Sequence, residues 1–317
     1  MRVWDFTEGS ERVVLAGHTG WIRAASCTEI DGRTHAVTAG DDGTVRVWDL
    51  ASGTERAALF GHSSAVHALA CTMIDGRPHA VSGSDDRTVR VWDLTQGTER
   101  AVLFGHAGAV QAVACTMIED RPYALTGGDD CKLRVWDLTD GTEQFTLTGH
   151  TDLVTAAACT EIDGRPHAVT AGHDRTVRVW DLTDQTERAA LAGHTGPVRT
   201  VECTTIDGRP YALTSGDDRK IRIWDLTDGT KRAVLSGHTG WVWAVACAEI
   251  DGRPYAVTVG KDQTVRVWDL RLSQHSSATT LPLPATALTV CGEDLVLNMG
   301  YEVFVLSRNS SGSPTRP

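Results

Sequence analysis

The stretch GHSSAVHALACTMIDGRPHAVSGSDDRTVRVWDL, residues 61–94, decides the fold. It contains three short runs, AVHALAC (65–71), HAVSG (79–83) and TVRVWDL (88–94), rich in β-branched and small apolar residues. Such runs are typical of strands. The Asp-Gly pair at Asp75 and Gly76 is typical of a tight hairpin. Together with ERAAL (55–59), the stretch predicts a sheet of four short strands and shows no helical periodicity.

Close copies of this stretch recur at intervals of 44 residues, for example from His18 to His62, and there are six complete copies. Each copy begins with Gly-His and ends with Trp-Asp. A four-stranded sheet of this size cannot bury both faces alone, whereas a ring of such sheets lets each pack on the next. The repeats therefore predict an all-β ring.

Composition narrows the possible functions. The chain has 317 residues and a formal net charge of −11, which gives it no general attraction for nucleic acids or acidic membranes. No apolar run is long enough for a transmembrane helix, and the first residues lack the apolar core of a signal peptide. We therefore expect a cytoplasmic protein.

Seven of the eight cysteines, from Cys27 to Cys291, recur every 44 residues. This regular spacing favours a small buried apolar position in each repeat over a disulfide framework or a metal site.

The repeat, with Gly-His near its start and Trp-Asp at its end, resembles the WD-repeat (WD40) β-propeller family over about residues 11–270. The TVRVWDL and DGRPHAV segments also resemble repeats of actinobacterial multidomain proteins. The family resemblance implies a hydrogen-bonded tetrad in each blade, in which His bonds Asp and a Ser or Thr that also reaches Trp. The six tetrads would be His18, Thr38, Asp42, Trp48; His62, Ser82, Asp86, Trp92; His106, Thr126, Asp130, Trp136; His150, Thr170, Asp174, Trp180; His194, Thr214, Asp218, Trp224; and His238, Thr258, Asp262, Trp268.

Ring closure requires a further unit. Because Cys291 continues the 44-residue register, residues 285–307 are interpreted as a degenerate seventh repeat with strands at 285–291, 295–298 and 302–306. Residues 11–15 would supply its fourth strand. We therefore predict a seven-bladed β-propeller of four-stranded antiparallel blades, closed by pairing of the N- and C-terminal strands. Its domain would span 11–307, with 1–10 a remnant of a preceding repeat and 308–317 a disordered tail. The remnant contains MRVWD, which would compete with residues 302–306 for one place. We favour a chain that begins inside a longer protein, and the alternative is that residues 1–5 take this place and displace the C-terminal strand.

Three columns of the repeat vary while the others are nearly fixed. The first column stands three residues after the tetrad His: Trp21, Ala65, Ala109, Leu153, Pro197 and Trp241. The second stands five residues after it: Arg23, His67, Gln111, Thr155, Arg199 and Trp243. The third precedes the tetrad Asp: Asp41, Asp85, Asp129, His173, Asp217 and Lys261. The resemblance implies that these columns meet a partner at one end of the ring. We predict an aromatic arc of Trp21, Trp241 and Trp243, interrupted at Ala285 and Ala287, with cationic Arg23 and Arg199 and an acidic opposite side.

The resulting hypothesis is a non-enzymatic scaffold that binds a protein or peptide through these columns. The resemblance suggests a module of a larger signalling or effector protein. The alternative is a propeller that binds a small molecule or carbohydrate at the channel mouth. A hydrolase triad of Thr, His and Asp is disfavoured because it would occur in six equivalent copies. Drift of surface columns after duplication is the other explanation for the variation. No cofactor, metal, nucleic acid or membrane partner is expected.

Overall fold

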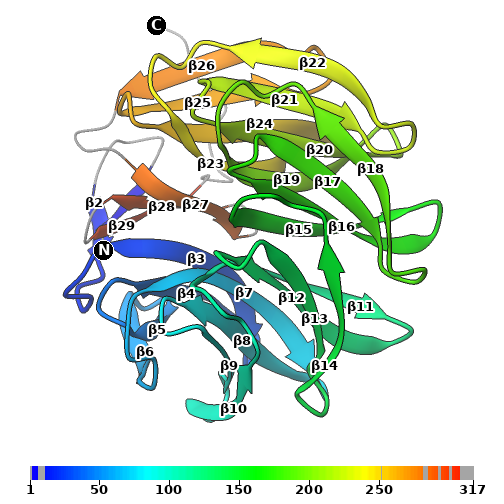
Figure 1. Ribbon diagram of the computed structural model, residues 1–317. Helices are drawn as coiled ribbons and strands as arrows, with labels where there is room; N and C mark the ends of the chain where they lie inside the picture. Colours follow the sequence, from blue (N-terminus) through cyan, green and yellow to red (C-terminus); the bar gives the residue numbers. More distant parts are fainter. Residues whose placement is uncertain are drawn as a thin grey trace, which may run out of the picture.

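A computed structural model describes residues 2–5, 11–250, 252–280, 285–291, 294–299 and 302–307, and strands are the regular elements of these residues (Figure 1). Side chains are described for 15–249, 252–275, 277–280 and 285–289. Six four-stranded antiparallel sheets, here called blades, follow one another along the chain. Their first strands line up around a common centre, and each blade packs against the next.

The first three blades occupy residues 22–148. Blade one consists of β3 (Ile22–Ile30), β4 (Arg33–Gly40), β5 (Val45–Asp49) and β6 (Thr54–Leu59). Blade two consists of β7 (Val66–Ile74), β8 (Arg77–Ser84), β9 (Thr88–Asp93) and β10 (Thr98–Phe104). Blade three consists of β11 (Val110–Ile118), β12 (Arg121–Gly128), β13 (Lys132–Asp137) and β14 (Thr142–Thr148).

The next three blades occupy residues 154–280. Blade four consists of β15 (Val154–Ile162), β16 (Arg165–Gly172), β17 (Thr176–Asp181) and β18 (Thr186–Ala192). Blade five consists of β19 (Val198–Ile206), β20 (Arg209–Gly216), β21 (Lys220–Asp225) and β22 (Thr230–Ser236). Blade six consists of β23 (Val242–Ile250), β24 (Arg253–Gly260), β25 (Thr264–Asp269) and β26 (Gln274–Thr280).

A further sheet, the closing sheet, has five strands in the order β2 (Glu11–Val14), β1 (Arg2–Asp5), β29 (Glu302–Ser307), β28 (Asp294–Met299) and β27 (Ala285–Cys291). Strand β27 lies between β23 of blade six and β3 of blade one (Figure 1). Strand β1 runs parallel to β29, so this sheet is mixed. The predicted seven-bladed propeller of four-stranded antiparallel blades is therefore wrong: the structure has six such blades.

The physical reason lies in the N-terminal segment. Strand β1 has the sequence RVWD, which is also the sequence of the third strand in several blades. It pairs with β29, in the place predicted for residues 11–15, and β2 then pairs with β1 on the outside. The two segments thus do not compete for one position, because both are added to the sheet. The predicted tail, 308–317, lies outside the described residues.

The first hairpins of blades one, two, four and five have the turn that their Asp-Gly sequence predicts. In blade two the turn residues Asp75 and Gly76 have φ angles of 51° and 72°. Positive φ at both central residues defines a type I′ turn, whose twist matches that of antiparallel strands. In blade three Glu119 and Asp120 take the same conformation without a glycine, with φ angles of 49° and 61°. The shape of the blade therefore persists where the favoured turn sequence is lost.

The hydrophobic core lies between blades rather than inside each one. One cluster joins Val37 and Val47 of blade one to Ala80 and Trp92 of blade two. The same arrangement recurs around the ring, and Leu288 of the closing sheet packs with blade six. Each sheet therefore buries its faces against its neighbours, as the argument from sheet size predicts.

The recurring cysteines lie on the first strand of each blade. Cys71, Cys115, Cys159, Cys203 and Cys247 are part-buried free thiols, and burial raises the pKa of Cys71 and of Cys159 to about 12. These thiols are uncharged, which fits the prediction of a small apolar position. Cys27 departs from that prediction because it is disulfide-bonded.

The tetrad hydrogen bonds are present in all six blades. In blade four the His150 Nδ1–H donates to Asp174 over 2.8 Å, and the Thr170 hydroxyl donates to His150 Nε2 over 2.8 Å. The Trp180 Nε1–H then donates to the same hydroxyl oxygen over 2.8 Å. This chain of bonds requires neutral histidine with its proton on Nδ1. It gives every buried polar group of the set a partner.

Burial and hydrogen bonding shift the pKa values of the tetrads. Burial lowers the pKa of five of the six histidines, namely His18, His62, His150, His194 and His238. Burial by itself would raise the pKa of Asp86, but hydrogen bonds from Thr88 and His62 outweigh it and hold that pKa at about 2. The network therefore favours a neutral imidazole beside an ionised carboxylate.

Replacing Thr170 with valine tests the network. The change keeps the shape of the side chain but leaves the Trp180 indole N–H and the His150 ring nitrogen buried without a partner. Each such loss costs about 1–3 kcal/mol, so we expect the free energy of unfolding in urea to fall by at least about 2 kcal/mol. Thr183→Val, on an exposed turn, serves as the control and should change it by less than about 0.5 kcal/mol. Equal effects of the two variants would contradict the argument.

Acid should weaken the tetrads. A lowered histidine pKa means that the unfolded chain binds protons first, so stability falls as pH drops below the ordinary value of 6.5. The lowered pKa of the tetrad aspartates adds a second loss as pH falls below 3.8. We expect the urea midpoint to decrease progressively on titration from pH 7.5 to pH 5. A midpoint that stays constant over this interval would show that the histidines are not held neutral.

Candidate binding face and channel

The first and third variable columns are neighbours in space. In every blade the backbone N–H of the third-column residue donates to the carbonyl of the first-column residue, for example Asp41 to Trp21 over 2.8 Å. The bond is the same between Lys261 and Trp241, where both side chains differ from the common pattern. The backbone of this surface is therefore constant, and only its side chains vary.

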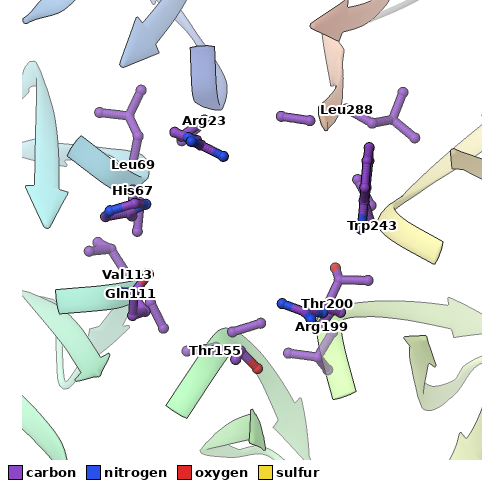
Figure 2. A pocket seen from close by; sticks show the side chains of 18 of the residues that line it. Arg23, His67, Leu69, Gln111, Val113, Thr155, Arg199, Thr200, Trp243 and Leu288 are labelled. Carbon is purple, nitrogen blue, oxygen red and sulfur yellow. The ribbon is translucent and has the colours of Figure 1, made fainter. Parts of the chain in front are cut away.

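The second column occupies a β-bulge at the start of the first strand. The register of β3 on β4 shifts between Ile22 and Ala24, so Arg23 has no ladder partner. The other first strands shift at the same place. A bulge re-aims its extra residue, and here it turns the second column toward the centre of the ring. These side chains surround an open cavity of about 260 Å³ (Figure 2).

The closing sheet carries the same bulge, but one residue away from the predicted position. The register of β27 on β28 shifts between Ala285 and Ala287, so Thr286 is the extra residue. The Thr286 hydroxyl donates to the Ile22 carbonyl over 2.9 Å, as that of Thr155 donates to Val198 over 2.5 Å. The prediction that Ala285 and Ala287 continue the variable columns is therefore wrong: Thr286 completes the ring.

Basic residues of the second column pair with acidic residues of the third column. Arg23 forms a two-bonded ion pair with Asp41, at 2.7 and 2.8 Å, and Arg199 does the same with Asp217, at 2.7 and 3.0 Å. His67 Nε2 lies 2.9 Å from an Asp85 carboxylate oxygen. The expected separation into a cationic side and an acidic side is thus wrong for these residues.

The three variable tryptophans differ in exposure. Trp21 and Trp241 are exposed, at 43% and 39%, whereas Trp243 is half-buried and lines the cavity. The Arg23 guanidinium carbon lies 5.6 Å from the centre of the Trp21 ring, and that of Arg199 lies 5.4 Å from the Trp241 ring. Each exposed indole is therefore stacked by an arginine that a carboxylate holds in place.

The other predicted residues are spread around the ring. Lys261 places its ammonium 4.5 Å from the Trp241 ring. Gln111 and Thr155 line the cavity, and Leu153 is half-buried beside them on the face. Asp129 is exposed. The remaining member, His173, is half-buried, and its Nε2 atom has no hydrogen-bond partner among the described residues.

One cavity residue was missed by the sequence reasoning. Glu202 lies on β19 and lines the cavity three residues beyond Arg199. The corresponding residues of the other five blades are small: Ser26, Ala70, Ala114, Ala158 and Ala246. Comparison of this column across the repeats would have found it. Desolvation raises the pKa of Glu202 to about 7.

The described part of the chain shows neither a metal-binding cluster nor a membrane-spanning helix. No group of three or more His, Cys, Asp or Glu side chains in it is arranged to hold a metal ion. It also contains no helix long and apolar enough to cross a lipid bilayer. The tetrad hydroxyls are fully buried, as at Thr38 and Ser82, so they cannot meet a substrate.

The chain belongs to the WD40 repeat family. The family model described as WD domain, G-beta repeat matches six segments: residues 9–49, 53–93, 97–137, 141–181, 185–225 and 229–269. These six repeats correspond to the six four-stranded blades. Each match begins one strand before its blade, so each repeat supplies the outer strand of the sheet that precedes it. No curated protein matches the sequence. WD40 propellers are in general non-catalytic scaffolds that bind proteins.

Glu202→Ala should stabilise the protein in a pH-dependent way. A raised carboxyl pKa means that the folded state loses stability as pH rises from the ordinary 4.5 through about 7. Each pKa unit corresponds to about 1.4 kcal/mol, and since water reaches the open cavity we expect a gain of about 2 kcal/mol at pH 8. The stability gained by the substitution should shrink toward pH 4.5. This pH dependence is opposite in sign to that of the tetrads, whose contribution to stability is lost as pH falls. Glu249→Ala, at an exposed position, is the control and should show no such pH dependence.

Proposed function

We propose that this protein is a non-enzymatic scaffold that binds a protein or peptide on the face formed by the three variable columns. The observation that carries the proposal is the pair of exposed tryptophans, each stacked by an arginine. Tryptophan and arginine are enriched at the energetic centres of interfaces. The arginines are pre-ordered by Asp41 and Asp217, so little side-chain entropy is lost on binding.

The arrangement favours binding over drift. Drift would vary the columns independently, whereas each basic residue of the second column stands opposite an aspartate in its own blade. The constant backbone hydrogen bonds provide a rigid platform for different side chains. A cytoplasmic location and a place in a larger signalling or effector protein are part of this proposal.

A comparison of two multiple variants tests the proposal. The variant Trp21→Ala, Trp241→Ala, Trp243→Ala removes the variable tryptophans. The matched control Phe60→Ala, Phe104→Ala removes two side chains that are more exposed, at 70% and 74%, but lie outside the variable columns. We expect a partner captured from lysate by the wild type to be retained by the control and lost by the tryptophan variant.

The purified partner then gives the quantitative test. Loss of a central aromatic anchor costs about 2 kcal/mol, so the tryptophan variant should bind at least about thirtyfold more weakly in calorimetry. Circular dichroism must first show that all three proteins are folded. Equal binding by the tryptophan variant and the wild type would reject this face as the interface.

A further inference from the structure

The cavity at the centre of the ring has a polar mouth and an apolar neck. The second-column residues form the mouth, and the apolar side chains of Leu69, Val113 and Leu288 line the same cavity (Figure 2). Val201 and Val245, each two residues beyond the second column, line it as well. Glu202 follows Val201 on β19. At about 3.3 Å per residue, its backbone lies about 10 Å along the strand from that of Arg199. A ligand that reaches Glu202 from this mouth must therefore pass through apolar surroundings.

Glu202 is a carboxyl group without a counter-ion. Within the described part of the chain it has no hydrogen bond and no ion pair to a side chain, and burial alone accounts for its raised pKa. The titratable groups near it are the thiols of Cys203 on its own strand and Cys247 on β23. Burial holds the pKa of both thiols well above their usual range, so they are neutral. No charged group on β15, β16 or β20 acts on Glu202. A desolvated carboxylate of this kind is costly unless a cation pairs with it.

The mouth would admit a cation. The two mouth arginines are neutralised by Asp41 and Asp217. The protein carries a net charge of −11, which attracts cations over a distance. Trp243 lines the same cavity and offers an indole ring, the best aromatic partner for an organic cation. The neck suits a stem of methylenes such as the four-carbon stem of lysine.

We propose that the central cavity binds a primary alkylammonium group, with Glu202 as its counter-ion, the apolar neck around its methylenes and Trp243 beside its path. The group belongs either to a free aliphatic amine or to a lysine side chain presented by a polypeptide. This site shares Trp243 and the cavity mouth with the variable face, but its counter-ion, Glu202, belongs to none of the three variable columns. Substitution of Glu202 therefore tests the amine site apart from the partner proposed for that face.

Ligand-observed NMR titration at pH 8 tests the proposal with n-pentylamine and with Nα-acetyl-lysine N-methylamide. We expect saturable binding of both to the wild type, and a loss of at least about tenfold in affinity in Glu202→Gln and in Glu202→Ala. Glu202→Ala carries the residue of four other blades and is expected to fold. Glu249→Gln is the matched control and should bind like the wild type. Tighter binding of the lysine derivative assigns the site to a polypeptide, and tighter binding of pentylamine assigns it to a free amine.

Two further measurements separate the carboxylate from general apolar binding. The uncharged 1-pentanol should bind the wild type at least about tenfold more weakly than pentylamine does. Affinity of the wild type for pentylamine should rise between about pH 6 and pH 8 as Glu202 ionises, and stay flat in Glu202→Gln. The proposal is overturned if neither amine saturates the wild type, if Glu202→Gln binds as well as the wild type, or if 1-pentanol binds equally.

Discussion

The hydrogen-bonded chain from tryptophan through threonine and histidine to aspartate holds together the surface on which function depends. Two of its members, the histidine and the aspartate, flank the variable columns: His18 precedes Trp21 by three residues, and Asp42 directly follows Asp41. Asp42 also accepts the backbone N–H of Thr19 over 2.9 Å. The tetrad therefore fixes the backbone around the first and third columns in each blade. The side chains of these two columns are therefore not needed to hold the backbone in place, and they can vary.

The β-bulge allows the side chains of the second column to vary in the same way. A bulged residue has no partner in the ladder, so its identity has little effect on strand pairing. Arginine, histidine, glutamine, threonine and tryptophan all occupy this position in one chain, on nearly the same backbone. The constraint that remains is electrostatic. Where the bulge carries Arg23, His67 or Arg199, the third column of that blade carries aspartate.

The sequence predicted the repeated unit well because each repeat carries its own evidence: the Asp-Gly turn, the strand composition and the tetrad residues. The segments that close the ring have no repeated copies in the sequence to support their assignment. The last unit lacks Gly-His and Trp-Asp, so Cys291 was the only guide to its register, and the structure places Thr286 rather than Ala287 at the bulge. The insertion of β1 between β29 and β2 depends on which strand edges are free in space. That information is not local to any stretch of sequence.

A comparison of equivalent positions across the repeats also explains why the sequence did not predict Glu202 as a site residue. The columns predicted to bind a partner are those that vary widely, whereas the Glu202 column is almost uniformly alanine. A single substitution in a column that is otherwise uniform is more informative than variation in a column that tolerates many residues. The reason is that packing constrains the uniform column and opposes the substitution. Among the described residues, five cores between neighbouring blades, a sixth between blade six and the closing sheet, and six complete tetrads stabilise the ring against the cost of one desolvated carboxyl group. Glu202 lines an open cavity, so a charge that would be only a defect in a filled core can act as a binding group there.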